Sequence, residues 1–94
     1  MTGFEDRMAA LRARFVERAG EDRAVMSAAL HAGDHAAMRR IAHSLAGNAG
    51  IFGFTEITGA ARAIEDALDI DTSGDALCRL CRELDDKLAA LSRQ

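Results

Sequence analysis

Apolar residues recur along this chain at intervals of three and four positions, which is the spacing of an amphipathic α-helix. The stripe in the N-terminal third consists of Phe4, Met8, Leu11, Phe15, Val25, Met26, Ala29 and Leu30. Gly20 lies between its two halves and either kinks the helix or weakens it by about 1 kcal/mol relative to alanine. The pattern leaves open whether this region forms one long helix or two.

Glycine and capping residues predict where the next helix begins and ends. Gly33 suits the left-handed conformation beyond a helix end, and Asp34 is a favourable N-cap for the helix that follows. We expect that helix to run from about His35 to Phe52, with Gly53 ending it. Thr55 is the expected cap of its successor.

Two further amphipathic segments complete the chain. The third helix has an apolar stripe made of Phe54, Ile57, Ala61, Ile64 and Leu68. After a polar loop, the last helix has an apolar face made of Leu77, Leu80, Cys81, Leu84, Leu88 and Leu91. Each helix must bury one stripe, and short loops force neighbouring helices to reverse direction. We therefore expect an all-α protein, an antiparallel four-helix bundle with or without an additional short N-terminal helix.

Composition narrows the class of protein further. With 94 residues, 49% of them hydrophobic and none of them proline, residues 1–94 are expected to form a single globular domain. Four phenylalanines, no tyrosine or tryptophan, and a net charge of −3 argue against a nucleic-acid partner. No apolar run is long enough for a membrane span and no signal peptide is recognisable, so we expect no membrane association. Two cysteines without a disulfide framework favour the cytoplasm.

Residues 41–53 form the segment that the packing pattern does not explain. On a helical wheel its core face consists of Met38, Ile41, Ala42, Leu45, Ala49 and Phe52. His43 falls about 140° from the centre of that face, on the solvent side, and Gly47 lies one turn later. Gly47 and Gly50 together cost on the order of 2 kcal/mol in helix propensity relative to alanine, and the core does not require them. Their effect is to clear side chains from around an exposed imidazole.

Positive charge lies beside this imidazole, because Arg39 and Arg40 come one turn before His43. A single histidine on a helix is usually an ordinary surface residue. A bare and accessible histidine flanked by cations, however, suits a nucleophile that a bulky anionic partner must approach.

The segment AHSLAGNAGIFG resembles the signature of histidine-containing phosphotransfer (HPt) domains, which is His-x-Leu-Lys-Gly followed by a second glycine. His43, Leu45, Gly47 and Gly53 match this signature. The downstream segment ITGAARAIEDAL, with Glu65 after an apolar residue, matches the next helix of the family. The resemblance extends over most of the chain.

One position departs from the family pattern. Where the family usually has a lysine near the phosphate, three residues after the histidine, this chain has Ala46. The role of that lysine is either missing here or taken over by Arg39, Arg40 or a residue of the neighbouring helix such as Arg62. Ala46 is accordingly grouped with Arg39, Arg40, Gly47 and Gly50 as the expected phosphate environment and docking surface.

The resemblance implies a phosphorelay intermediate in two-component signalling. His43 would accept a phosphoryl group from the aspartate of one response-regulator receiver domain and pass it to the aspartate of another. The Mg²⁺ ion would reside on the receiver domain, and the chain itself would bind no cofactor. The expected protein is a monomeric phosphocarrier rather than an enzyme, with a hybrid histidine kinase as a further candidate partner. The alternative is an HPt-like adaptor or inhibitor that docks a receiver domain or a kinase without being phosphorylated.

Three other groups of residues have ordinary explanations. Cys78 and Cys81 form a CxxC pair inside a helix, away from the helix start that would lower a thiol pKa, and we expect a structural role. His31 and His35 flank a helix break and lack further ligands, so no metal site is expected. The acidic residues around the third loop lack the ligand spacing of a calcium-binding loop. These residues are Asp66, Asp69, Asp71 and Asp75.

Overall fold

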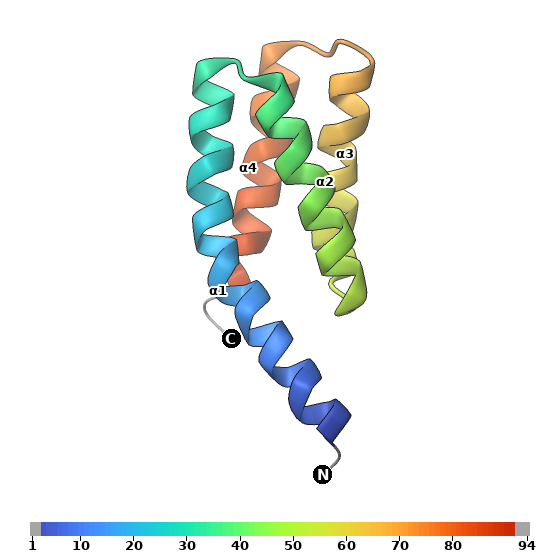
Figure 1. Ribbon diagram of the computed structural model, residues 1–94. Coiled ribbons are helices and arrows are strands. Elements are labelled where there is room, and N and C mark those ends of the chain that lie inside the picture. Colours follow the sequence, from blue (N-terminus) through green and yellow to red (C-terminus); the bar gives the residue numbers. More distant parts are fainter. Residues whose placement is uncertain (1–2, 92–94) are drawn as a thin grey trace.

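The computed structural model describes residues 3–91 and consists, over that range, of four α-helices (Figure 1). Their bounds are α1 Gly3–Ala32, α2 His35–Ile51, α3 Thr55–Asp69 and α4 Gly74–Leu91. Helices α1 and α3 each pack against both α2 and α4, so the four form an antiparallel bundle. This confirms the predicted fold class. The N-terminal region is one continuous helix of 30 residues, and residues 3–91 contain no additional short helix.

The predicted breaks between the first three helices are confirmed, with one correction. Gly33 and Gly53 have φ values of 68° and 76°, which is the left-handed conformation that glycine adopts without a steric penalty. Asp34 caps α2, because its carboxylate accepts a hydrogen bond of 3.1 Å from the backbone N–H of Ala37. Helix α2 ends at Ile51, one residue earlier than expected.

The cap expected at Thr55 is wrong. The N-cap of α3 is Phe54, which makes no side-chain capping hydrogen bond, and Thr55 is the first helical residue. The ring of Phe54 stacks on Phe15 with the ring centroids 5.5 Å apart, and it also packs against Phe52. Aromatic packing therefore fixes the entry into α3 where the sequence suggested a hydroxyl cap.

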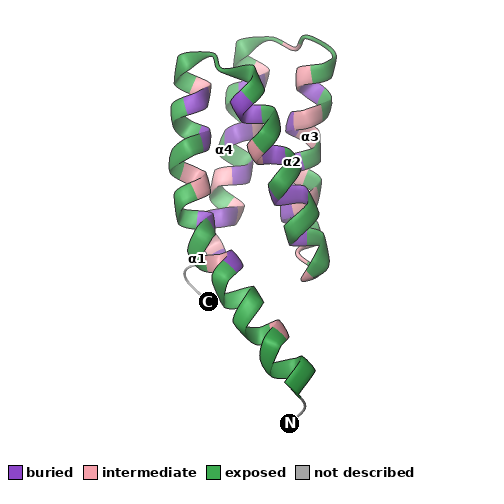
Figure 2. Ribbon diagram, viewed as in Figure 1, coloured by how far each residue is buried: buried purple, intermediate pink, exposed green. Residues whose placement is uncertain are grey.

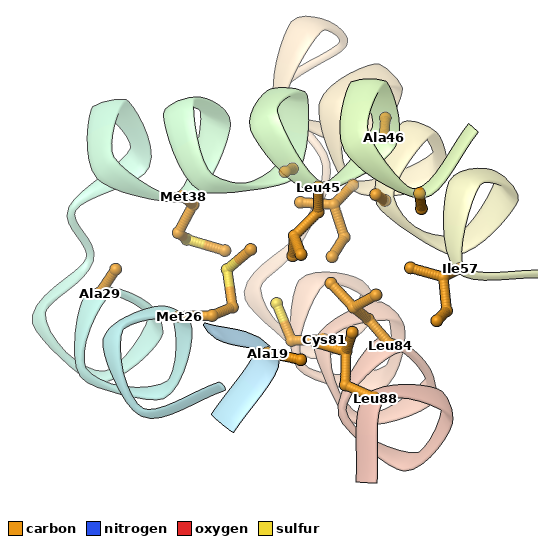
Figure 3. Packing of buried hydrophobic residues seen from close by; sticks show 14 of the residues in the cluster. Ala19, Met26, Ala29, Met38, Leu45, Ala46, Ile57, Cys81, Leu84 and Leu88 are labelled. Carbon is orange, nitrogen blue, oxygen red and sulfur yellow. The ribbon is translucent and has the colours of Figure 1, made fainter. Parts of the chain in front are cut away.

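The interior of the bundle is apolar throughout the described part of the chain. Its largest fully buried side chains are Met38, Leu45, Ile64 and Leu84, and no described polar or charged residue is buried. Figure 3 shows Met26 and Met38 pointing toward one another and Leu45 and Leu84 pointing into the same interior. Every buried polar side-chain atom of residues 3–91 has a hydrogen-bond partner. Functional polar groups of the described residues must consequently be sought on the surface.

The N-terminal apolar stripe is only partly buried, which corrects the sequence interpretation. Phe15 belongs to the core, but Phe4 is 64% exposed, Leu11 47% and Val25 50%. Figure 1 shows the reason for the first two, since the beginning of α1 extends past the ends of the other helices. Helical periodicity identifies an apolar face, but it does not show that another helix is long enough to cover that face.

An ion pair joins α1 to α4 on the bundle surface. The guanidinium of Arg23 donates two hydrogen bonds, of 2.7 and 3.1 Å, to the carboxylate of Asp85. These bonds lower the pKa of Asp85 and raise the pKa of Arg23. Both side chains are more than one-third exposed, so solvent screens the pair and its contribution to stability is small. Along residues 3–91, no helix combines the length and the hydropathy that a membrane span requires.

Candidate functional site

His43 projects from the middle of α2 into solvent. Its side chain is 82% exposed, whereas its neighbours Ala42 and Leu45 are 0% and 2% exposed. The backbone of α2 is held by these buried neighbours, so the position of the imidazole is set by a rigid element. The sequence placed His43 opposite the core face, and its exposure agrees with that placement.

Glu65 on α3 orients the imidazole ring. The Nδ1 atom of His43 lies 3.0 Å from the Oε2 atom of Glu65, whose side chain is 22% exposed. An ionised carboxylate only accepts hydrogen bonds, so in this pair Nδ1 donates its hydrogen and the lone pair of the neutral ring is at Nε2. None of the described residues hydrogen-bonds to Nε2. The pair therefore turns the nucleophilic nitrogen of the ring toward solvent.

A second ionic contact runs parallel to the first. Arg39, one turn before His43 on α2, pairs with Asp69, one turn after Glu65 on α3. Because the two helices are antiparallel, positions 39 and 43 face positions 69 and 65 in a constant register. The guanidinium of Arg39 thus binds the carboxylate of Asp69. Arg39 could line a phosphate site at His43, as the sequence predicted, only if this ion pair were broken.

The two glycines after His43 have different surroundings. A Cβ atom added to Gly47 would meet no heavy atom within 4 Å, so the surface one turn beyond His43 is open. A Cβ atom added to Gly50 would lie 3.9 Å from the hydroxyl of Thr58 on α3, which is ordinary van der Waals contact. Gly47 therefore provides clearance on the solvent side, while Gly50 borders α3. Both are exposed.

Ala46 lies in the core, which corrects its assignment to the phosphate environment. It is 4% exposed and belongs to the buried apolar cluster. On α2 it precedes Gly47 and projects toward the interior, where a lysine could reach solvent only with its long stem. The structure gives no polar function to this position. Leu45 and Gly53, the other two motif positions, are a core residue and the helix-ending residue, respectively.

Two arginines near His43 remain without an ion pair among the described residues. Arg40 is exposed on α2, three residues before His43. Arg62 is exposed on α3, three residues before Glu65. In the register set by Arg39 and Asp69, Arg62 lies across from Ala46, on the side of Glu65 that faces Gly47. Both guanidinium groups are long and mobile enough to approach an anion bound at His43.

Sequence reasoning missed the role of Asp69, which was assigned to loop solvation with Asp66, Asp71 and Asp75. The signal for it was present, since Asp69 follows Glu65 by four residues just as His43 follows Arg39. Using that signal required the α2–α3 register, which periodicity does not contain.

Three other residues that the sequence analysis considered are His31, Cys78 and Cys81. His31 is exposed and its Nδ1 lies 2.8 Å from the backbone oxygen of Ser27. Residues 3–91 contain no group of three side chains that could hold a metal ion. Cys78 is exposed and Cys81 is buried, and burial raises the pKa of the Cys81 thiol to about 11. Such a thiol is a poor nucleophile at neutral pH.

A comparison with protein families finds one match, described as Hpt domain, over residues 10–94. No curated protein and no solved structure matches the chain. The family match includes the whole of α2 and α3, and therefore His43, Gly47 and Gly50 on α2 and Glu65 on α3.

Proposed function

The chain belongs to the Hpt domain family, and we propose on this basis that His43 is the phosphoacceptor of a phosphorelay. Domains of this family are phosphocarrier modules of two-component signalling and interact with receiver domains and histidine kinases. The observation that carries the assignment to His43 is its contact with Glu65. Among the three histidines of the chain, it is the one held by a carboxylate from a neighbouring helix.

The proposed step is an in-line displacement at phosphorus. The lone pair on Nε2 of His43 attacks the phosphoryl group of a receiver aspartyl phosphate, an N–P bond forms, and the P–O bond to the aspartate breaks. The carboxylate of that aspartate leaves with the electron pair. Transfer to a second receiver reverses these events with a new aspartate as nucleophile.

Glu65 assists this step without touching phosphorus. As Nε2 forms its bond, the imidazole becomes cationic, and the Glu65 carboxylate at Nδ1 stabilises that charge. The same hydrogen bond keeps the reactive tautomer populated before attack. Glu65 is thus a positioning residue, and the Mg²⁺ ion and acidic cluster that activate the phosphoryl group belong to the receiver domain.

Arginine side chains, rather than a lysine, neutralise the negative charge of the phosphoryl group on His43. Arg40 and Arg62 flank His43 from α2 and α3 and carry no competing ion pair among the described residues. Guanidinium groups form paired hydrogen bonds to phosphate oxygens, so two arginines supply what Ala46 lacks.

Incubation with a phosphorylated receiver domain and Mg²⁺ tests the proposal. The chain is expected to acquire an acid-labile, base-stable phosphate on His43, detected by mass spectrometry at neutral pH. A receiver that binds the chain without transferring phosphate would instead support the adaptor alternative, which the missing lysine at position 46 favours. Screening several receiver domains in parallel separates a wrong partner from an inactive histidine, since one transferring receiver suffices.

A further inference from the structure

The first 12 described residues of α1, residues 3–14, form an arm that extends past the bundle (Figures 1 and 2). Phe4 and Leu11 are large apolar residues that the bundle leaves 64% and 47% exposed, and Met8 between them is half-buried. The family match begins at residue 10, so most of the arm lies outside the part of the chain shared with the family. Phosphotransfer at His43 does not explain why the arm exposes an apolar face. A further partner that packs against this face would explain it.

An isolated helical segment of this length is marginally stable in water. Its exposed side chains are also those that gain most from burial, at roughly 25 cal/mol per Å² of apolar surface. The positions 4, 8 and 11 are separated by four and three residues, which is the spacing of a two-helix seam. A second helix packed along this seam would bury all three side chains together.

We propose that this second helix is the arm of another copy of the chain, packed antiparallel, so that the protein forms a symmetric dimer in place of the monomer that the family resemblance led us to expect. Charge favours this occupant and this direction. The tip of the arm carries two acidic residues and one basic residue, Glu5, Asp6 and Arg7, and its base carries Arg12 and Arg14. At 100° per residue Glu5 and Arg12 flank the seam on the same side, whereas Asp6 lies on the opposite face of the helix. An antiparallel pair therefore places Glu5 of each copy beside Arg12 of the other, twice by symmetry. A parallel pair would place like charges together.

Shape favours the same arrangement. A hollow lies where the arm joins the bundle, lined by Met8, Arg12 and Val16 of α1 together with Ile51 and Phe52. Ile51 is 65% exposed at its rim. In an antiparallel pair, Phe4 of each copy reaches the base of the other arm and enters this hollow. Each copy then supplies one aromatic side chain and one hollow, as an isologous interface requires.

Sedimentation velocity of the full 94-residue chain over a range of concentrations tests the proposal. We expect a reversible monomer–dimer equilibrium, and Phe4→Glu or Leu11→Glu should each raise its dissociation constant at least tenfold. Val25→Glu and Ile70→Glu are matched controls, because these residues are 50% and 76% exposed but lie outside the arm. The controls should leave the dissociation constant unchanged, and circular dichroism should show the same bundle melting for all four variants.

The direction of packing has its own test. Glu5→Arg and Arg12→Glu, both at exposed positions that flank the seam, should each weaken the dimer, and combining them in one chain should restore it. Restoration is specific to tip-to-base pairing. A chain that stays monomeric at every concentration, or a dimer unaffected by Phe4→Glu and Leu11→Glu, would overturn the proposal. So would loss of receiver binding in those two variants without any change in mass, which would identify a receiver as the occupant. The readout is mass, so the result does not depend on whether His43 is phosphorylated.

Discussion

Arg39 and Asp69 form an ion pair between α2 and α3 one helical turn from the pair formed by His43 and Glu65. The two contacts share one register and hold the face of α2 that carries the imidazole against α3. Arg39 is thereby bound to a carboxylate, although it lies one helical turn from His43.

Replacing Asp69 should therefore leave the guanidinium of Arg39 free to approach His43. We expect Asp69→Ala to lengthen the lifetime of phosphorylated His43 by about two- to fivefold, because the freed guanidinium of Arg39 can hydrogen-bond to the phosphoryl oxygens. The lifetime is measured as loss of phosphate from the purified phosphoprotein. Asp66→Ala is the control for a general change in charge, since Asp66 is exposed on α3. Equal lifetimes for the two variants would show that Arg39 does not reach the phosphate.

His43→Gln should abolish phosphate uptake. The free energy of unfolding should change by less than about 0.5 kcal/mol, because the side chain is 82% exposed. Phosphate uptake is followed by mass spectrometry and stability by urea denaturation. His31→Gln and His35→Gln serve as controls and should accept phosphate normally. Phosphate found on either of them in the wild-type protein would contradict the assignment.

Glu65→Ala should slow phosphoryl transfer by on the order of tenfold, because the ring loses both its orientation and the charge that stabilises the imidazolium. Glu65→Gln retains a hydrogen-bond acceptor and should lie between the alanine variant and the wild type. Nitrogen NMR of the His43 ring supplies a readout that a merely structural role would not change: the fraction protonated at Nδ1 should fall in Glu65→Ala.

Glu83→Ala on α4 is the matched control for Glu65, as an exposed carboxylate distant in sequence from the site. It should alter neither the transfer rate nor the tautomer of His43. If Glu65→Ala left the tautomer unchanged while slowing transfer, Glu65 would act in receiver docking instead.

Substitutions at Gly47 should separate stability from function. Gly47→Ala should stabilise the fold by roughly 0.4–1 kcal/mol, because the added methyl meets no atom within 4 Å and the unfolded chain loses freedom. Gly47→Leu should leave the fold intact but reduce transfer and receiver affinity sharply, since its side chain stands beside the imidazole. Gly20 is an equally open glycine within α1, so Gly20→Leu should keep the transfer rate of the wild type. Equal transfer by the alanine and leucine variants at position 47 would refute the clearance argument.

The buried thiol of Cys81 predicts a loss of stability in alkaline solution. Burial raises its pKa from 9.0 to about 11, so the folded state retains the proton that the unfolded state releases. This contribution is fully present below pH 9 and is lost as the pH rises through 11. Between pH 8 and pH 10.5, we expect the wild type to lose on the order of 1 kcal/mol more of its unfolding free energy than Cys81→Val loses, because the variant has no thiol to titrate at this position. Urea denaturation at the two pH values measures both losses.

Local signals in the sequence were sufficient for the helix breaks and for the exposure of His43. The helix ends at Gly33 and Gly53 depend on the backbone conformation of those two glycines. The cap of α2 depends on a hydrogen bond between Asp34 and a residue three positions later. The residue types alone therefore predict where these helices end and begin. The position of His43 on the solvent side follows from helical geometry alone. These features depend on interactions within one helix or one turn.

Features that depend on how helices meet could not be predicted in the same way. The pairing of Arg39 with Asp69, and the burial of Ala46, depend on the register between α2 and α3, which no local pattern contains. The exposure of Phe4 and Leu11 depends on the length of the other helices. The packing of Phe54 at the start of α3 depends on the ring of Phe15, which comes from α1.

The division of α2 into a buried face and a reactive face has a consequence for how such a protein can change over evolutionary time. Core residues such as Met38 and Leu45 can be exchanged for other apolar residues under selection for folding alone, without altering what a receiver meets. A Cβ atom at position 47 would meet no heavy atom of the bundle within 4 Å, so this position can vary with the partner without disturbing the core. The two sets can therefore change independently, and Ala46, which is 4% exposed, belongs to the buried one. A residue at position 46 is selected for its packing, and partner choice is left to the exposed positions around His43.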